Sequence, residues 1–266
     1  MSELVKISIS NHVADVRLNR PEKYNALNPD MFKAIIEAGR SLGQDTSVRA
    51  VVLLGEGRGF CAGLDFQGFV EMGEKGALNL METGQGQIAN NAQLPAMIWK
   101  QVPVPVIAAL HGVAYGGGLQ IALGADIRIA APDTRMSVME IKWGIIPDMS
   151  ATQTLRDLVR LDVAKELTFS GRVVEAAEAE KLGLVTRVSE NPLDEAYKMA
   201  NVFAARNPSA VAAAKHLLET TWHADAEEGL KLEASLQRSL MGTPNQMEAA
   251  ASNFEKREPK FADREE

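Results

Sequence analysis

Three consecutive glycines, Gly116, Gly117 and Gly118, constrain this chain more than any other feature of its sequence. Because they carry no β-carbon, a substrate or a neighbouring segment can lie directly against their backbone N–H groups. An apolar run over residues 102–110 predicts a buried strand before the triplet, and the residues after it predict a helix that begins near Gly118. The first N–H groups of a helix are unpaired and carry a partial positive charge. The sequence therefore predicts a site that stabilises an oxygen gaining negative charge.

Two carboxylates follow the triplet in the segment VMEIKWGIIPDMS, at Glu140 and Asp148. Burial would raise the pKa of each carboxyl and make it a base able to take a proton from a weakly acidic carbon. A pair of acids can remove a proton at one carbon and return one at another. Either residue could instead be an exposed loop acid, and Asp148 could instead cap the helix predicted over ATQTLRDLV.

Five segments resemble, in order, the crotonase (enoyl-CoA hydratase/isomerase) superfamily, and the resemblance covers nearly the whole chain. The segments are LNRPEKYNAL, GRGFCAGLDF, HGVAYGGGLQIALGADIRIA, EIKWGIIPDMSATQTL and SGRVVEAAEAEKLGLV. The resemblance implies an α/β fold, built as a spiral of ββα units with a helical C-terminal region. It also implies an enzyme of unsaturated acyl-CoA metabolism, such as fatty acid β-oxidation, assembled as a homotrimer or a dimer of trimers.

The resemblance implies roles for single residues. It implies that the N–H groups of Leu64 and Gly117 hold the thioester oxygen. Glu140 matches one of the two catalytic glutamates of the hydratases, and Asp148 matches a catalytic aspartate of the dienoyl-CoA isomerases. The chain departs from the family at Gln120, where the hydratases have their other glutamate. Because a neutral amide can orient water but cannot act as a general base, this departure favours double-bond isomerisation over hydration.

Coenzyme A is expected as part of the substrate, with no separate cofactor. It is a polyanion with an adenine ring, so it requires cations and backbone polar groups at a pocket mouth. The resemblance implies a lining by Lys23, Tyr24, Asn25, Ala26, Ala62, Gly63, Asp65 and Gly116, with Lys260 and Phe261 reaching it from an adjoining subunit. Trp143 could wall the acyl pocket or belong to the core. The cations Arg20, Lys23 and Lys260 could instead be solvated surface residues.

Composition excludes several classes of protein. The chain has 266 residues and is 46% hydrophobic, which is ample for a packed core. Its net charge of −7 argues against nucleic acid as a partner. The four histidines have no metal-ligand spacing, so no metal site is expected. His111 is expected to have a structural hydrogen-bonding role.

Cys61 is the single cysteine and is predicted to be a small core residue rather than a nucleophile. It fits a reducing compartment, because it cannot form an internal disulfide. The first residues lack the apolar run of a signal peptide or a membrane span, so a cytoplasmic protein is expected.

The remaining pattern indicates alternating strands and helices. Residues 4–18 predict a hairpin around Asn11 and His12, a helix is predicted to begin at Asn28 and Pro29, and residues 50–54 predict a strand covered on both faces. Residues 70–99 predict a loop with a loosely patterned helix, either a mobile wall of the substrate pocket or a surface excursion. The pattern is helical from Asn191 onward. We therefore expect a core with the acyl-CoA site over residues 1–195 and a helical oligomerisation region over residues 196–266.

Three alternatives to an isomerase stay open. The first is an enoyl-CoA hydratase in which Glu140 acts with a water that Gln120 positions. The second is an aryl-CoA dehalogenase-like enzyme with Asp148 as the nucleophile. The third is a non-catalytic acyl-CoA-binding or scaffold protein, in which Gln120 would be a sign of lost activity.

Overall fold

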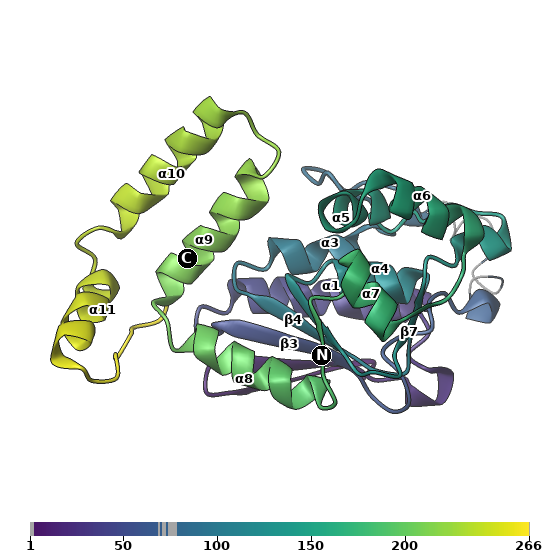
Figure 1. The fold of residues 1–266 in the computed structure, drawn as a ribbon, viewed down its shortest axis with the longest axis horizontal. Helices are drawn as coiled ribbons and strands as arrows, with labels where there is room; N and C mark the ends of the chain where they lie inside the picture. The colour runs from purple at the N-terminus through teal and green to yellow at the C-terminus, as the bar shows by residue number, and fades with distance from the viewer. Residues whose placement is uncertain (1–2, 69, 71–72, 74–78, 266) are drawn as a thin grey trace.

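The computed structural model describes residues 3–68, 70, 73 and 79–265, and these form a mixed α/β protein, which confirms the predicted class (Figure 1). The larger sheet has six strands in the order β1-β2-β3-β4-β6-β9. The hairpin strands β1 and β2 pair antiparallel, and every other neighbouring pair is parallel. Its strands are β1 (Val5–Ser10), β2 (Val13–Leu18), β3 (Ala50–Gly55), β4 (Val106–Leu110), β6 (Ile127–Ala130) and β9 (Arg187–Val188).

The first hairpin turns at the predicted place. Asn11 and His12 both have positive φ, at 50° and 66°, which is the backbone of a two-residue turn whose twist matches the flanking strands. The strand predicted over residues 102–110 is shorter than expected, since β4 begins only at Val106. The prolines Pro103 and Pro105 explain the difference, because a proline has no N–H to donate to a neighbouring strand.

A second, smaller sheet lies next to the site and has the order β5-β7-β8. Its strands are β5 (Val113–Tyr115), β7 (Arg135–Ser137) and β8 (Val174–Glu175). β5 leads directly into the glycine triplet, and β7 ends shortly before Glu140. The Gly116 N–H donates to the Ser137 carbonyl at 2.9 Å. This sheet therefore places the triplet beside the segment that carries the first acid.

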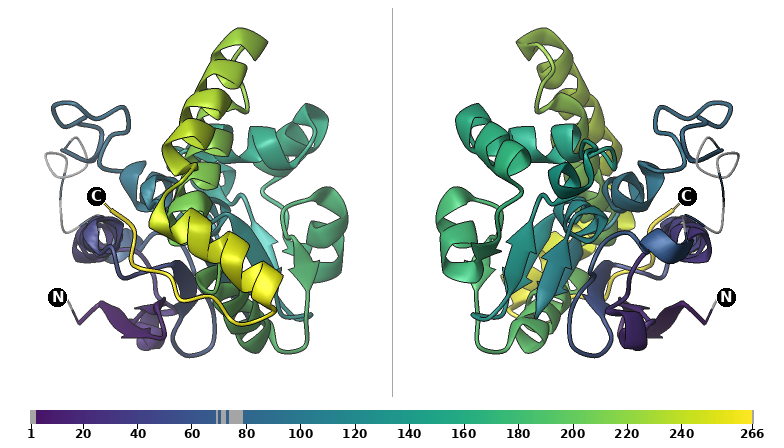
Figure 2. Two further views of the ribbon diagram at one scale, coloured as in Figure 1. Left: turned by 90° about the vertical axis from the view of Figure 1, so that its left-hand side faces the viewer. Right: turned by 90° about the vertical axis from the view of Figure 1, so that its right-hand side faces the viewer.

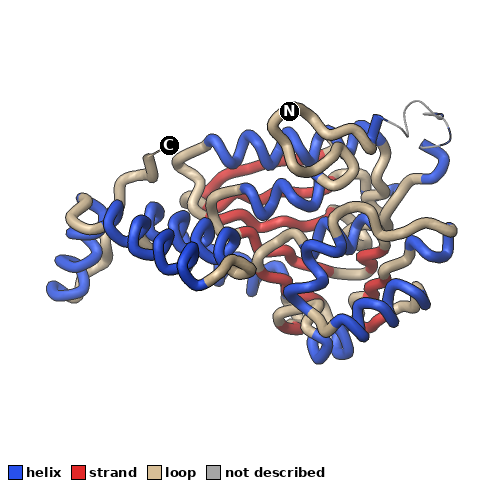
Figure 3. Tube along the Cα trace, turned by 90° about the horizontal axis from the view of Figure 1, so that it is seen from above, coloured by secondary structure: helices blue, strands red, loops and turns tan. Residues whose placement is uncertain are grey.

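Helices cover both faces of the larger sheet (Figure 3). The helices α1 (Pro29–Gln44), α3 (Leu94–Gln101) and α4 (Gly117–Leu123) pack on one face. The helix α8 (Pro192–Ala204) packs on the other face through Ala196, Ala200 and Ala204. α1 begins where predicted, with the Asn28 side chain accepting from the Met31 N–H at 2.9 Å. The helices α5 (Ala151–Leu158), α6 (Leu161–Ser170) and α7 (Ala176–Leu182) complete the body of the protein.

The C-terminal helices α9 (Pro208–Thr221), α10 (Ala226–Leu240) and α11 (Pro244–Glu255) form an arm that extends from this body (Figure 1). α10 buries none of its residues within the chain. The tail after α11 returns to the body (Figure 2), where Arg49 donates to the Phe261 carbonyl at 3.0 Å and to Asp263 at 2.9 Å. The boundary expected at residue 195 falls inside α8, so the helices that leave the body begin at Pro208.

A buried ion pair fixes the base of the arm. Lys215 of α9 donates to Asp126 at 2.7 Å and to the carbonyls of Trp99 and Val104 at 2.9 and 3.1 Å. All three ammonium protons thus have acceptors, which offsets much of the cost of burying the charge.

Candidate active site

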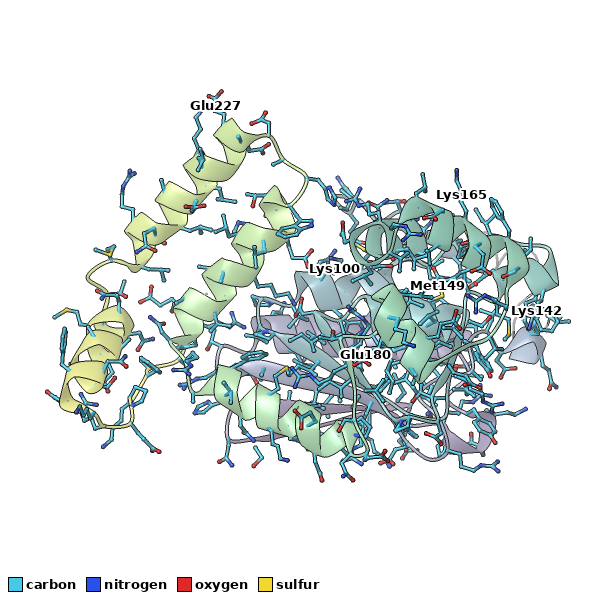
Figure 4. The ribbon with its side chains drawn as sticks, viewed as in Figure 1. Lys100, Lys142, Met149, Lys165, Glu180 and Glu227 are labelled. Carbon is cyan, nitrogen blue, oxygen red and sulfur yellow. The ribbon has the colours of Figure 1, made fainter. Side chains whose placement is uncertain are left out.

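Each glycine of the triplet lies close to another segment, which a β-carbon at that position would meet. A β-carbon on Gly118 would lie 2.4 Å from the Cys61 carbonyl oxygen, and one on Gly117 would lie 2.6 Å from Met149 Sδ. One on Gly116 would lie 3.3 Å from Glu140 Oε1. The triplet is therefore the meeting point of three segments that are distant in sequence. Figure 4 shows Met149 within the body of the protein, away from the arm.

The turn that carries Leu64 lies against the same triplet. Gly63 has φ +90°, and a β-carbon there would be 2.6 Å from the Tyr115 carbonyl oxygen and 3.6 Å from the Gly117 nitrogen. Leu27 forms a parallel bridge with Leu64 by donating to the Gly63 carbonyl and accepting from the Asp65 N–H, at 2.7 and 2.9 Å. Such a bridge leaves the N–H of Leu64 itself directed away from Leu27.

Neither the Leu64 N–H nor the Gly117 N–H donates a hydrogen bond to any residue that the structure describes. Gly117 is the first residue of α4, so its N–H belongs to the unpaired first turn of a helix. Two donors on adjoining segments are thus available to a carbonyl oxygen, as predicted for the thioester.

Glu140 is the first residue of the 3-10 helix η2 (Glu140–Trp143) and is only 6% exposed. Its Oε1 accepts a hydrogen bond from Gln120 Nε2 at 2.6 Å. Its Oε2 is buried and has no partner among the described residues. Burial raises the pKa of Glu140, and the charge of Asp148 raises it further, while the Gln120 hydrogen bond opposes both. A buried carboxylate with one free oxygen is suited to act as a base.

Asp148 precedes α5 and is partly buried, and this burial raises its pKa. The alternative in which Asp148 caps α5 is wrong, because the N-cap position is held by Ser150. Asp148 lies close enough to Glu140 for its charge to act on that carboxyl. The structure therefore brings the two predicted acids together.

Gln120 is almost fully buried in α4, so it does not reach toward solvent. Its amide spans two groups. While Nε2 donates to Glu140, Oε1 accepts from the Ala151 N–H at 3.1 Å. Gln120 thus joins Glu140 to the first turn of α5, a connection that the sequence did not reveal.

Two residues expected to line the coenzyme A pocket hold the local loops, and their contact with coenzyme A stays a prediction. The fully buried Asn25 donates through Nδ2 to the carbonyls of Glu56, Gly59 and Phe60. Asp65 accepts from Arg20 Nη1 at 2.6 Å, and this guanidinium lowers the pKa of the Asp65 carboxyl. Arg20 is therefore not a solvated surface cation, and the pair fixes the turn that carries Leu64.

The other predicted pocket residues on this side reach the surface. Lys23 is exposed, and Tyr24, Ala26 and Ala62 are partly exposed. The Arg58 guanidinium lies over the Tyr24 ring, 4.7 Å from its centroid, and adds a cation that the sequence interpretation missed. Contact of these residues with coenzyme A stays a prediction.

Trp143 is 57% exposed, so the interpretation of this residue as core is wrong. Its ring lies on that of Phe66, with the centroids 3.9 Å apart. Phe66 follows the turn that carries Leu64, and Trp143 lies in the same 3-10 helix as Glu140. The aromatic pair therefore joins the donor segment to the acid segment. Much of the wall predicted over residues 70–99 lies outside the described residues.

Lys260 and Phe261 do not join this site within one chain. Arg49, which donates to the Phe261 carbonyl, immediately precedes β3, so this contact lies at the N-terminal end of that strand. The site segments follow the C-terminal ends of the parallel strands, at the other edge of the sheet. Their predicted role requires an adjoining subunit and stays a prediction.

Two other expectations are confirmed. His111 Nε2 lies 3.0 Å from the Gly57 carbonyl oxygen, which is a structural hydrogen bond. Cys61 is buried, and this burial raises the pKa of its thiol to about 12, so it is not a ready nucleophile.

Within the described ranges, no cluster of three or more metal-ligating side chains is found. Over the same ranges, no helix has the length and apolar character needed to cross a membrane.

Comparison with known proteins agrees with this geometry. A family model described as enoyl-CoA hydratase/isomerase matches residues 8–264. The mitochondrial methylglutaconyl-CoA hydratase of Mus musculus is 33% identical over an alignment of 251 residues that covers 92% of this chain and 77% of the mouse protein. The mitochondrial Delta(3,5)-Delta(2,4)-dienoyl-CoA isomerase of Dictyostelium discoideum is 32% identical over an alignment of 267 positions that covers 95% of this chain and 88% of that protein.

Solved structures show the same likeness. The crystal structure of an enoyl-CoA hydratase from Bacillus anthracis superposes with a TM-score of 0.90 at 29% identity, over 97% of this chain and 98% of that one. The predicted resemblance to the crotonase superfamily is thereby confirmed, and the chain belongs to the enoyl-CoA hydratase/isomerase family.

Proposed function

We propose that this protein moves a double bond in an unsaturated acyl-CoA thioester without a separate cofactor. The proposed steps need only two proton transfers and a stabilised enolate. The described residues offer the groups for each, namely the Leu64 and Gly117 N–H donors and the acids Glu140 and Asp148.

The N–H donors lower the free energy of the enolate. When a proton leaves the carbon beside the thioester carbonyl, negative charge moves to the carbonyl oxygen. Donors already fixed by the backbone stabilise that charge without rearranging, and one such donor typically contributes about 3 kcal/mol. The free N–H groups of Leu64 and Gly117 are held in place by close packing at Gly63 and at the triplet.

The two acids divide the proton transfers. Ionised Glu140 takes the proton from the carbon beside the carbonyl, and the electron pair of that C–H bond enters the enolate. Protonated Asp148, whose pKa is raised by burial, then gives a proton to a more distant carbon of the conjugated system. The double bond is left in its new position. Glu140 has gained a proton and Asp148 has lost one, so proton exchange with water restores the starting state.

The state of Gln120 is the observation that favours isomerisation over hydration. Hydration requires a water to be activated at one carbon while a proton is delivered to the adjacent one. Gln120 holds the position of the second acid, but it is neutral and both ends of its amide are already hydrogen-bonded within the protein. It can therefore neither take a proton from water nor readily turn to bind one.

Enoyl-CoA hydration is the second candidate. It is supported by the names of relatives such as methylglutaconyl-CoA hydratase, and by the presence of Glu140. In that case Glu140 would activate the water alone.

Deuterium incorporation tests whether the protein is an enzyme of this kind. A 3-enoyl-CoA incubated with the protein in deuterated water should be converted to a 2-enoyl-CoA that contains carbon-bound deuterium, detected by mass spectrometry. Glu140→Gln should lower conversion and incorporation together by roughly 10²-fold or more. Tight binding of the thioester by the wild-type protein without either would favour the non-catalytic alternative and contradict the proposal.

A further inference from the structure

We propose that Gln120 is a positioning residue that gives the two carboxylate oxygens of Glu140 different roles. In this account Oε1 is a permanent hydrogen-bond acceptor, and Oε2 alone receives and releases the substrate proton. The inference rests on the proposed function, because it takes Glu140 to be the base.

The orientation of the Gln120 amide is fixed by its second partner. The Ala151 N–H can only donate, so the group facing it must be the amide oxygen. The NH₂ group is then directed at Glu140 Oε1, at 2.6 Å. Turning the amide over would place donor against donor at Ala151 and acceptor against acceptor at Glu140. Because Gln120 is almost fully buried, such mismatches would be costly.

This orientation decides where a proton can reside on Glu140. A proton on Oε1 would face the NH₂ group of Gln120, with no acceptor on that side. Oε2 is the buried atom without a partner among the described residues. The proton taken from the substrate is therefore carried on Oε2.

The backbone at Ser150 supports this arrangement. Ser150 is a buried non-glycine residue in the left-handed region, with φ +69°, a conformation that costs about 1 kcal/mol or more. It stands at the N-cap of α5, yet its side chain does not cap the helix and bonds to the Met149 carbonyl at 2.5 Å instead. Ala151 is the first residue of α5, so its N–H has no partner within the helix and donates to Gln120 instead. Strained backbone of this kind is concentrated at functional sites.

A glutamate at position 120 would change the chemistry of Glu140. Two carboxylates at hydrogen-bond distance cannot both ionise readily, so the pair would hold a proton and titrate in two coupled steps. Gln120 avoids this coupling and, by donating to the carboxylate, opposes the rise in the pKa of Glu140. Gln120 is thereby also a determinant of specificity, because it keeps Glu140 available as a base and removes the second acid that hydration uses.

The test uses Gln120→Met, which has similar length but cannot donate to a carboxylate, and Gln120→Glu. With a 3-enoyl-CoA, Gln120→Met should lower kcat by about 10-fold or more, as expected for losing a hydrogen bond to a charged group. The acid limb of its pH profile should move to higher pH, while KM changes little. Gln120→Glu should raise hydration of a 2-enoyl-CoA above wild type and should give a pH profile with two coupled steps.

Two results would overturn the inference. One is a Gln120→Met enzyme that is folded by circular dichroism and has the wild-type kcat and pH profile. The other is a further loss when Gln120→Met is added to Glu140→Gln, because a residue that acts through Glu140 has nothing left to act on in that background. If Gln120→Met does not fold, Gln120→Glu, which keeps an acceptor for Ala151, decides the matter through its pH profile. Full activity of Glu140→Gln alone would instead refute the proposed function.

Discussion

The charge of Asp148 raises the pKa of Glu140, a carboxyl that burial already holds above its ordinary value. The loop between η2 and α5 brings the second acid back to the first, and Met149, the neighbour of Asp148, packs against Gly117. The acids and the donor at Gly117 therefore form one unit, in which a change at one acid alters the titration of the other.

Neutralising either acid should remove catalysis and spare binding. We expect Glu140→Gln and Asp148→Asn each to lower kcat by roughly 10²-fold or more, because both groups act mainly in the transition state. Acyl-CoA affinity, measured by calorimetric titration, should stay close to wild type. Unchanged turnover in Asp148→Asn would remove this residue from the mechanism.

The pH profile should report both acids. Activity requires ionised Glu140, so the acid limb of kcat/KM should lie above the ordinary glutamate pKa of 4.5. The proposed steps also require protonated Asp148, so activity should fall again on an alkaline limb, and this limb should be absent from the residual activity of Asp148→Asn. Steady-state rates across the pH range measure both limbs. An alkaline limb that persists unchanged in Asp148→Asn would show that Asp148 does not deliver the proton.

Gly63→Ala tests the donor pair. The added methyl group would overlap the Tyr115 carbonyl oxygen and displace the Leu64 N–H, so we expect kcat/KM to fall by about 10²-fold or more. Gly242→Ala is the matched control. Gly242 also has positive φ, at +75°, but a β-carbon there meets nothing within 4 Å, so only a small loss of stability is expected. Equal kinetic effects of the two substitutions would argue against the oxyanion hole.

Removing the tail after Asn253 tests the proposed assembly into a homotrimer or a dimer of trimers. α10 has no buried residue within the chain, and Leu230 on it is exposed, which leaves an apolar surface for a partner. The truncation removes Lys260 and Phe261 and the anchor between Arg49 and Asp263. We expect weaker coenzyme A binding by calorimetry and smaller particles by sedimentation.

Lys260→Ala separates the two effects of truncation, because it keeps the anchor. It should weaken coenzyme A binding without changing particle size. A truncated protein of unchanged size and affinity would show that the tail is peripheral and that one subunit completes the pocket.

The features that the sequence predicted are those set by neighbouring residues. The turn at Asn11 and His12, the helix that Asn28 caps and the glycine triplet all follow from local backbone requirements. The sequence did not predict that Asn25 and Asp65 hold the local loops. The polar groups that would bind a ligand can equally bind loop carbonyls, as in Asn25, or an arginine, as in Asp65.

Long-range pairs escaped prediction for a related reason. Gln120 contacts Glu140 and Ala151, which lie 20 and 31 residues away in the sequence. Contacts over such separations are not set by the repeat of a single helix or strand. The buried pair of Lys215 and Asp126 spans 89 residues. Only the packing of several elements brings such groups together. The sequence therefore showed that Gln120 differs from the glutamate of the hydratases, but not which groups Gln120 binds.

Comparing three substrates with one preparation of the wild-type enzyme tests the central claim most directly. The initial rates on 2-enoyl-, 3-enoyl- and 3,5-dienoyl-CoA would be measured together with the masses of the products. The account predicts that a 3-enoyl- or 3,5-dienoyl-CoA is converted to an isomer of unchanged mass with a higher kcat/KM than that for hydration of the 2-enoyl-CoA. Hydration of the 2-enoyl-CoA, seen as a product heavier by one water, at a rate equal to or above that of isomerisation would contradict it.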